Sequence, residues 1–343
     1  MTRLSQLLKD KSIDGDQAAP VWFMRQAGRY LPEYREVRAQ TSDFISFCLD
    51  PERASKVTLQ PIERVDLDAA IIFSDILMIP WQMKRGVHFV QGEGPKLTPL
   101  ENVADIDPNW ADSFEADLEP VSKAMGLTRA ALAADKDLIG FSGAPWTLMT
   151  YMIEGGSSRD FANSRNWLWQ RQSESQALLE MLSYAVAKFL KLKAASGASV
   201  LMIFDSWASA VPASKRQEVV IEPFQKIISY LRAWDINQPV MCFPKGLGEG
   251  LVSFADSVAC DGLGIDQFTD LNWAAQHLRS DLVLQGNIDP LAVVAGGDAM
   301  RQEADKVRQA MTGRPHIFNL GHGFVPQTPP EHVADLVSYW RAG

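Results

Sequence analysis

Short apolar runs recur along the chain between turn residues, and they are separated by longer segments whose apolar positions repeat at helical spacing. A short apolar run bounded by turn residues is typical of a buried strand. The eight runs are "VWFM" (21–24), "AAIIFSD" (69–75), "LIGFSG" (138–143), "VLMIFDS" (200–206), "VMCFPKG" (240–246), "GLGID" (262–266), "LVLQGN" (282–287) and "HIFNLGH" (316–322).

The segments between the runs predict helices with polar outer faces. Pro51 stands early in its segment, and Gly197 and Gly313 stand just past segment ends, which matches the usual helix start and stop signals. Alternating apolar strands and helices predict a parallel sheet covered on both faces, and eight units predict a closed (β/α)8 barrel of the TIM type. The clearest helical segments are 51–65, 173–197, 213–234 and 297–313.

No linker, charge block or low-complexity tract divides the chain, so we predict a single TIM-barrel domain over residues 1–343. Within it, residues 1–17 form an N-terminal segment and residues 18–343 form the catalytic barrel. The chain exceeds the ~250 residues typical of this fold, which predicts insertions. We expect a hairpin at 86–97 after the second strand and a helical insertion at 145–169 after the third.

Composition narrows the class of partner. The chain is 46% hydrophobic and carries a formal net charge of -9, so its overall field repels nucleic acid and anionic membranes. Any anionic ligand must therefore be held by a few placed arginines or backbone N–H groups. Three distant cysteines suggest neither a disulfide framework nor a metal site, and no apolar run reaches the ~20 residues that span a bilayer. We expect a cytoplasmic protein.

Unusual side chains come directly after several of the predicted strands. In a (β/α)8 barrel, the carboxyl ends of the strands meet at one mouth, where active sites form. Aromatic residues at the same strand ends would supply apolar walls, so the set suits a ligand with an apolar body and several carboxylates. The polar candidates are Arg25, Arg29, Asp75, Asp205, Ser206 and His322, and the aromatic candidates for the pocket lining are Phe73, Phe141 and Phe204.

Each candidate also has a structural interpretation. Asp75 can cap the helix after it, Asp205 and Ser206 can be turn and cap residues, and His322 can fill a loop between two glycines. No sequence pattern of a zinc site, a P-loop or a dinucleotide fingerprint is present. Lys245, in "CFPKG", remains open as a Schiff-base lysine, because the sequence does not say whether its side chain points inward.

Longer motifs then point to a family. "PVWFMRQAGRYLPEYRE" (20–36) and "GFSGAPWTLMTYMIEGG" (140–156) resemble the two signature segments of the uroporphyrinogen decarboxylase family, and "AAIIFSDIL", "IFDSWA" and "FNLGHG" are similar to its other blocks. The resemblance implies a TIM-barrel carboxy-lyase that removes the four acetate carboxyl groups of uroporphyrinogen III without metal or organic cofactor. It also implies a cytoplasmic homodimer.

The resemblance assigns roles by position. Arg25 and Arg29 would bind substrate carboxylates and take part in catalysis, and Asp75 would face the pyrrole N–H groups and stabilise developing positive charge. The other substrate contacts it implies are Gln26, Ala27, Gly28, Tyr151, Ser206 and His322. Two further functions stay open at this point, a corrinoid-linked methyltransferase on the same barrel and a tetrapyrrole-binding protein without catalysis.

Overall fold

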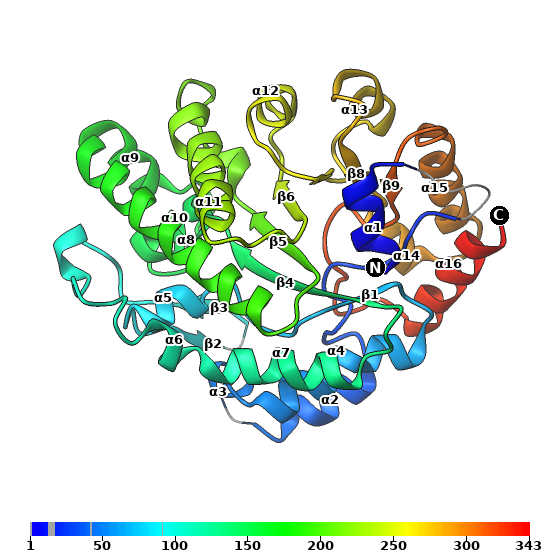
Figure 1. The fold of residues 1–343 in the computed structure, drawn as a ribbon, viewed down its shortest axis with the longest axis horizontal. Coiled ribbons are helices and arrows are strands. Elements are labelled where there is room, and N and C mark those ends of the chain that lie inside the picture. The colour runs from blue at the N-terminus through cyan, green and yellow to red at the C-terminus, as the bar shows by residue number, and fades with distance from the viewer. Residues whose placement is uncertain (1, 13–17, 42, 91) are drawn as a thin grey trace.

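A computed structural model of the chain describes residues 2–12, 18–41, 43–90 and 92–343. Within these residues, the main sheet is parallel and curled, with helices around its outside (Figure 1). The predicted parallel sheet covered by helices is thereby confirmed. Its seven strands, in spatial order, are β1 (Ala69–Ile71), β4 (Asp137–Gly143), β5 (Val200–Asp205), β6 (Val240–Pro244), β7 (Gly262–Gly264), β8 (Val283–Gln285) and β9 (His316–Ile317).

The strand predicted at residues 21–24 is wrong as a regular strand. Only Val21 forms a bridge, to Phe318, although the segment joins both edges of the sheet: Asp68 N donates to Val21 O, and Phe318 N donates to Pro20 O, each at 2.8 Å. Side chains interrupt the ladder beyond this point. The N–H of Phe23 donates to Gln26 Oε1, and that of Met24 donates to Asn319 Oδ1.

The four clearest predicted helices are confirmed as α4 (Pro51–Arg64), α10 (Gln172–Ala195), α11 (Glu222–Ala233) and α15 (Gly297–Ala310). Asp50 caps α4 by accepting from Arg53 N at 3.0 Å, directly before the proline that opens the helix. The other α-helices are α1 (Arg3–Asp10), α2 (Pro32–Ala39), α3 (Phe44–Cys48), α5 (Met78–Gln82), α6 (Phe114–Asp117), α7 (Glu119–Ala131), α8 (Pro145–Glu154), α9 (Ala162–Gln170), α12 (Gly250–Ser257), α13 (Leu271–His277), α14 (Pro290–Ala295) and α16 (Pro330–Ala342).

A two-stranded hairpin lies between α5 and α7. Its strands β2 (His88–Val90) and β3 (Gly94–Lys96) pair antiparallel. Lys96 also bridges Gly156, just after α8, and Leu97 N donates to Gly155 O at 3.0 Å. The hairpin and α8 therefore lie side by side, and both flank the sheet on the side where β1 and β4 end.

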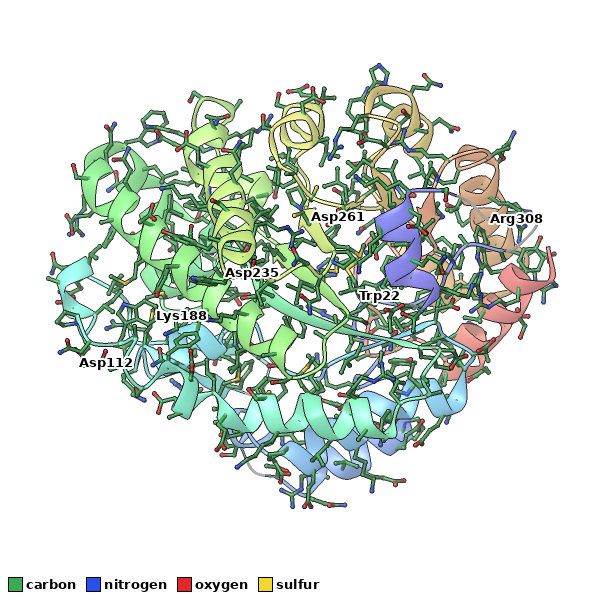
Figure 2. The ribbon with its side chains drawn as sticks, in the orientation of Figure 1. Trp22, Asp112, Lys188, Asp235, Asp261 and Arg308 are labelled. Atoms are coloured by element: carbon green, nitrogen blue, oxygen red, sulfur yellow. The ribbon has the colours of Figure 1, made fainter. Side chains whose placement is uncertain are left out.

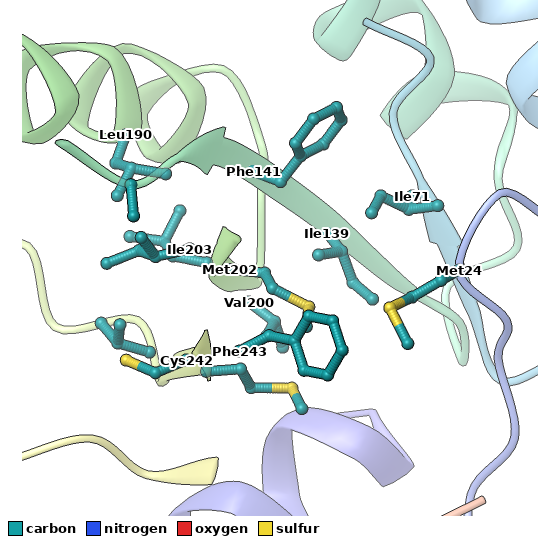
Figure 3. Packing of buried hydrophobic residues seen from close by; sticks show 14 of the residues in the cluster. Met24, Ile71, Ile139, Phe141, Leu190, Val200, Met202, Ile203, Cys242 and Phe243 are labelled. Atoms are coloured by element: carbon teal, nitrogen blue, oxygen red, sulfur yellow. The ribbon is translucent and has the colours of Figure 1, made fainter. Parts of the chain in front are cut away.

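The core separates into an inner and an outer layer, because side chains alternate along each strand. Figure 3 shows Met202 and Phe243 on the inner side of the sheet with Met24, whereas Ile203 and Cys242 lie on the other side, as does Leu190 of α10. Trp22, labelled in Figure 2, is fully buried, and its Nε1 donates to Gln285 Oε1 on β8 at 2.8 Å. Among the described residues, no helix is both long and apolar enough to cross a bilayer.

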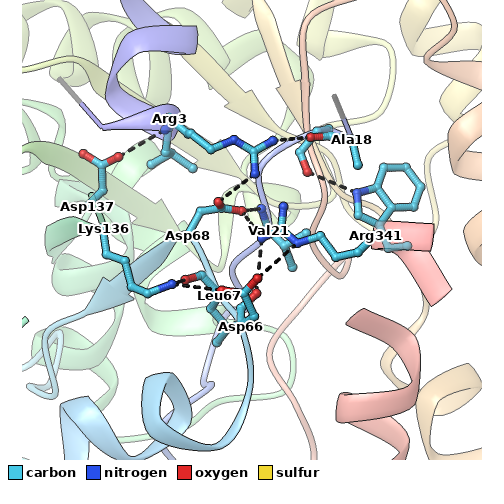
Figure 4. A network of polar contacts seen from close by, with 12 residues as sticks. Arg3, Ala18, Val21, Asp66, Leu67, Asp68, Lys136, Asp137 and Arg341 are labelled. Atoms are coloured by element: carbon cyan, nitrogen blue, oxygen red, sulfur yellow. Dashed lines mark hydrogen bonds and ion pairs between the residues drawn. The ribbon is translucent and has the colours of Figure 1, made fainter. Parts of the chain in front are cut away.

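The amino ends of the strands are closed by α1 and a polar network (Figure 4). Asp68 accepts from Arg3 at 3.0 Å, from Val21 N at 2.6 Å and from Arg341 at 2.6 Å. A cavity of about 640 Å³ lies beside this network, lined in part by Arg3, Arg308 and Trp340. It is the wrong end for barrel chemistry, which belongs to the carboxyl ends of strands. The expected boundary between residues 17 and 18 falls at positions outside the described residues.

Candidate active site

Aromatic rings from neighbouring strands form the floor of the candidate site. Met202 and Phe204 point inward on β5, and the register places Phe204 opposite Phe243 of β6. The ring of Phe204 lies 5.6 Å from that of Phe141 and 6.1 Å from that of Phe243, both in edge-to-face contact. Phe243 was missed by the sequence analysis, although the same two-residue alternation on β6 could have identified it.

Phe73 lies apart from this floor. Its ring packs 4.8 Å from Phe47 and 5.6 Å from Tyr34, on α3 and α2, and its N–H donates to Thr58 Oγ1 instead of to the β1 ladder. The chain has left the ladder by this position, since β1 ends at Ile71. Phe73 therefore packs against α2 and α3. We expected it to line the pocket with Phe141, but its aromatic contacts are with these helices.

Arg25 is held in an unusual backbone conformation at the end of the first segment. Its φ is +60°, a left-handed value that costs a non-glycine residue about 1–2 kcal/mol. The stem of Arg25 lies so close to Gly323 that a Cβ there would be 2.4 Å from Arg25 Cδ, and Phe324 N donates to Met24 O at 3.1 Å. Strain maintained by its surroundings is characteristic of functional positions.

Asp75 is enclosed by protein and still partly accessible to solvent. Loss of solvation is the largest influence on its pKa and raises it, while the Leu77 N–H and the charges of Arg25 and Lys193 act in the opposite direction. Its Oδ1 accepts from Leu77 N at 2.8 Å. The capping interpretation is therefore confirmed for one carboxylate oxygen of Asp75.

Arg25 combines exposure and enclosure in the same way. Its side chain is exposed, yet desolvation is the largest influence on its pKa and lowers it, against the charge of Asp75. Arg25 is therefore in contact with solvent and also surrounded by enough protein to lose part of its solvation. None of the ion pairs among the described residues includes Arg25, Arg29 or Asp75. The arginine and the carboxylate are close enough to influence each other and remain available to a ligand.

Tyr151 and His322 complete this group. Burial is the largest influence on the pKa of Tyr151 and raises it; the Trp207 side chain lowers it, and the charges of Asp75 and Arg25 act in opposite directions. Burial, Arg25 and Lys245 lower the pKa of His322 to about 3. At neutral pH the imidazole is therefore uncharged, and His322 offers a hydrogen-bonding group rather than a cation. Ser206 is half-buried and directly follows β5, two residues beyond Phe204.

The segment between the two arginines has a structural and an exposed part. Gln26 is fully buried, and its amide is occupied by two backbone groups: Oε1 accepts from Phe23 N, and Nε2 donates to Ala69 O at 3.0 Å. Ala27 and Gly28 are half-buried, and Arg29 is exposed. The side chain of Gln26 therefore fixes the turn that presents Arg25, a role that the sequence analysis did not assign to it.

Asp205 points toward α8. Its Oδ1 accepts from Thr147 Oγ1 at 2.6 Å, and its Oδ2 has no partner among the described residues. Burial raises its pKa to about 7. Because the unfolded chain has the ordinary aspartate pKa of about 3.9, the native state alone holds this proton between those values, and stability should fall as pH rises from about 4 to about 7.

Asp205→Asn is expected to remove this part of the pH dependence. A pKa rise of this size corresponds to about 4 kcal/mol at most, and the amide keeps an oxygen for Thr147. Urea unfolding at pH 5.5 and pH 8 gives the change in the free energy of unfolding between these pH values, and this change is compared between wild type and variant. Equal pH dependence in the two proteins would show that Asp205 does not titrate with folding.

Comparison with known proteins agrees with this geometry. The family model of uroporphyrinogen decarboxylase (URO-D) matches residues 1–342. Proteins named uroporphyrinogen decarboxylase are 44% identical in Granulibacter bethesdensis, over 94% of both chains, and 40% identical in Jannaschia sp., over 100% of both. That of Rhodospirillum rubrum is 44% identical over 94% of this chain and 93% of its own.

Solved structures show the fold at much lower identity. A methyltransferase from Methanosarcina mazei superposes with a TM-score of 0.79 at 18% identity, covering 98% of this chain and 97% of its own. A B12-independent methionine synthase from Shewanella sp. gives a TM-score of 0.55 at 9% identity, covering 85% and 86%. These two share the fold alone. The match of the family model over residues 1–342, with the near full-length relatives, shows that the chain belongs to the uroporphyrinogen decarboxylase family.

Proposed function

We propose that this protein converts uroporphyrinogen III to coproporphyrinogen III by removing the four acetate carboxyl groups as CO2, in porphyrin and haem biosynthesis. The proposal places the reaction in a closed (β/α)8 barrel whose first strand position is taken by residues 20–24, without metal or organic cofactor. The observation that supports it is that Arg25 and Asp75 act on each other's pKa without forming an ion pair, while Arg25 lies against Gly323, next to His322, whose ring is 6.5 Å from Phe243 of the aromatic floor.

The residue types suit this chemistry. Protonation of a pyrrole carbon next to an acetate side chain makes the ring a cation. Breaking the bond to the carboxylate then delivers its electron pair to that cation and releases CO2. A carboxylate that accepts hydrogen bonds from the pyrrole N–H groups stabilises the cation as it forms, and such a preorganised group is commonly worth about 3–4 kcal/mol. Asp75 takes this role in the proposal.

The arginines suit the periphery of the same substrate. A guanidinium can hold a carboxylate through two parallel hydrogen bonds and stays charged beside an apolar ring. Arg25 is held at one place by its backbone and by Gly323, and Arg29 is exposed four residues later. The two therefore offer one fixed and one adaptable carboxylate contact.

Arg29→Lys is expected to weaken substrate binding by about tenfold, since the charge remains and the bidentate geometry is lost. The variant should fold normally, because Arg29 is exposed and no ion pair among the described residues includes it. Initial rates over a range of uroporphyrinogen concentrations measure the change in KM. An unchanged KM would show that Arg29 does not bind a substrate carboxylate.

The experiment that tests the function is anaerobic incubation of the purified protein with uroporphyrinogen III and no added cofactor. Appearance of coproporphyrinogen supports the decarboxylase. A well-folded preparation that binds the substrate without turnover would overturn it in favour of a tetrapyrrole-binding protein.

The assembly and location of the enzyme are part of the same proposal. Resemblance to the family supports a homodimer that acts in the cytoplasm on a small tetrapyrrole. Sedimentation velocity of the purified protein tests the dimer, and a monomer at micromolar concentration would contradict it. Fractionation of source cells tests the location.

A further inference from the structure

Lys245 directly follows β6, whose residue Phe243 belongs to the aromatic floor. On β6, the inward-pointing Phe243 packs 6.1 Å from Phe204 and 6.5 Å from His322, both of which belong to the candidate site. β6 ends at Pro244, but the N–H of Lys245 still donates to Asp205 O at 3.1 Å, as in the parallel ladder. The strand-like backbone thus extends to Lys245, which continues the face of Phe243. The same hydrogen bond places Lys245 beside the end of β5, which Ser206 follows directly.

The turn after Lys245 fixes its backbone. Ser209 N donates to Lys245 O at 3.2 Å, and Gly246 N donates to Asp266 Oδ2 at 2.8 Å. Gly246 has a φ of +72°, and a Cβ there would lie 2.8 Å from Ser209 Cβ. The lysine therefore starts from a rigid position, and only its side chain is adaptable.

The ammonium group of Lys245 has no hydrogen bond or ion pair among the residues that the structure describes. Other half-buried lysines do: Lys136 bonds Asp66 at 3.1 Å, and Lys215 bonds Glu218 at 2.6 Å. Asp266, the carboxylate nearest in its electrostatic effect, uses its two oxygens for the N–H groups of Gly246 and Phe268.

Charge around Lys245 favours an anion. Burial is the largest influence on the pKa of Lys245 and lowers it; the charge of Asp266 raises it, and that of Arg25 lowers it again. Arg25 and Lys245 also both lower the pKa of His322. Two cations thus act on one neutral imidazole, with Arg29 close to Arg25. A half-buried ammonium that no acceptor contacts directly is unfavourable, and a bound carboxylate supplies that contact.

We propose that Lys245 binds a peripheral carboxylate of the tetrapyrrole and acts as a fixed positive charge rather than as a nucleophile. The inference rests on the proposed function for the identity of the ligand. The proposed role is an alternative to Schiff-base formation, which the sequence left open for the same lysine.

Binding and turnover test different parts of the proposal. Uroporphyrin, the oxidised octacarboxylate, and coproporphyrin, the oxidised tetracarboxylate, serve as binding probes that cannot react. Tryptophan fluorescence titration at several salt concentrations is run with wild type, Lys245→Met and Lys245→Arg. Lys123→Met is the matched control, since Lys123 is exposed on α7 and paired with Glu119.

Lys245→Met is expected to weaken uroporphyrin binding about tenfold and to make it less dependent on salt, whereas Lys123→Met leaves both unchanged. Lys245→Arg keeps the charge and has no primary amine, so it should restore most of the affinity and retain turnover. Unchanged affinity in Lys245→Met would overturn the proposal. So would an Arg variant that binds uroporphyrin normally and no longer turns over, because that result requires the amine.

The experiments distinguish a failure of the proposed decarboxylase activity from a failure of the proposed Lys245 contact. Wild-type protein that binds uroporphyrin without decarboxylating uroporphyrinogen contradicts the enzyme activity, while the comparison of Lys245→Met with Lys123→Met still supports or overturns the carboxylate contact. Wild-type protein that binds neither porphyrin overturns both.

Discussion

Asp75→Asn is expected to lower kcat for uroporphyrinogen by about 10²–10³-fold while the protein stays folded. The amide is nearly the same size, and its oxygen can still accept from Leu77 N, so the local turn is kept. The variant loses the negative charge that would stabilise a pyrrole cation. Single-turnover rates, with circular dichroism as a check on folding, measure the effect.

The same variant carries a pH signature that a structural role would not produce. Burial raises the pKa of Asp75 above its ordinary value, so the wild-type rate should fall on the acid side at a higher pH than an exposed aspartate would give. The variant should lack this acid limb, and its affinity for unreactive uroporphyrin should change only a few-fold. A near-normal rate, or an acid limb retained in the variant, would remove Asp75 from the reaction.

Gly323→Ala is expected to lower kcat/KM by about 10²-fold, because a shift near 1 Å in a positioning group can have that effect. The new methyl carbon would lie 2.4 Å from Arg25 Cδ and 2.9 Å from Arg25 Cβ, so the arginine must move from its base outward. Steady-state kinetics of the two proteins measure the loss.

Gly126→Ala is the matched control, since nothing lies within 4 Å of the methyl position in α7 and alanine favours a helix. A double-mutant cycle with Arg25→Ala identifies the route of the effect: once Arg25 is truncated, Gly323→Ala should cost little more. Additive losses would show that the glycine matters for a reason unrelated to Arg25.

Much of the architecture was predictable because its signals are local. The strands from β1 to β9 in the main sheet coincide with apolar runs between turn residues, and Asp75, Arg25 and His322 stand out because each lies at the carboxyl end of such a run. The sequence does not show that these residues influence one another. That follows from the folded structure, in which Arg25 affects the pKa of both Asp75 and His322.

The parts that sequence did not predict depend on contacts between distant segments. Phe73 was expected in the pocket lining because it lies near the end of a predicted strand, yet β1 has ended before it and its ring packs on α2 and α3. Gln26 was expected to contact substrate, and its amide is used by Phe23 and Ala69. The left-handed backbone at Arg25 could not be predicted, because the residue itself is not a glycine. The room for its side chain comes from Gly323, almost three hundred positions away.

The carboxylate of Asp68 joins Arg3, Val21 and Arg341, and its contact with Arg341 spans 273 positions. During translation this contact cannot form before residue 341 has left the ribosome. At about 5–20 residues per second, synthesis of the intervening chain takes roughly 14–55 s. For that interval Asp68 can bind Arg3 and Val21 but not Arg341, so the contact that ties the amino-terminal part of the sheet to α16 is the last of the three to form.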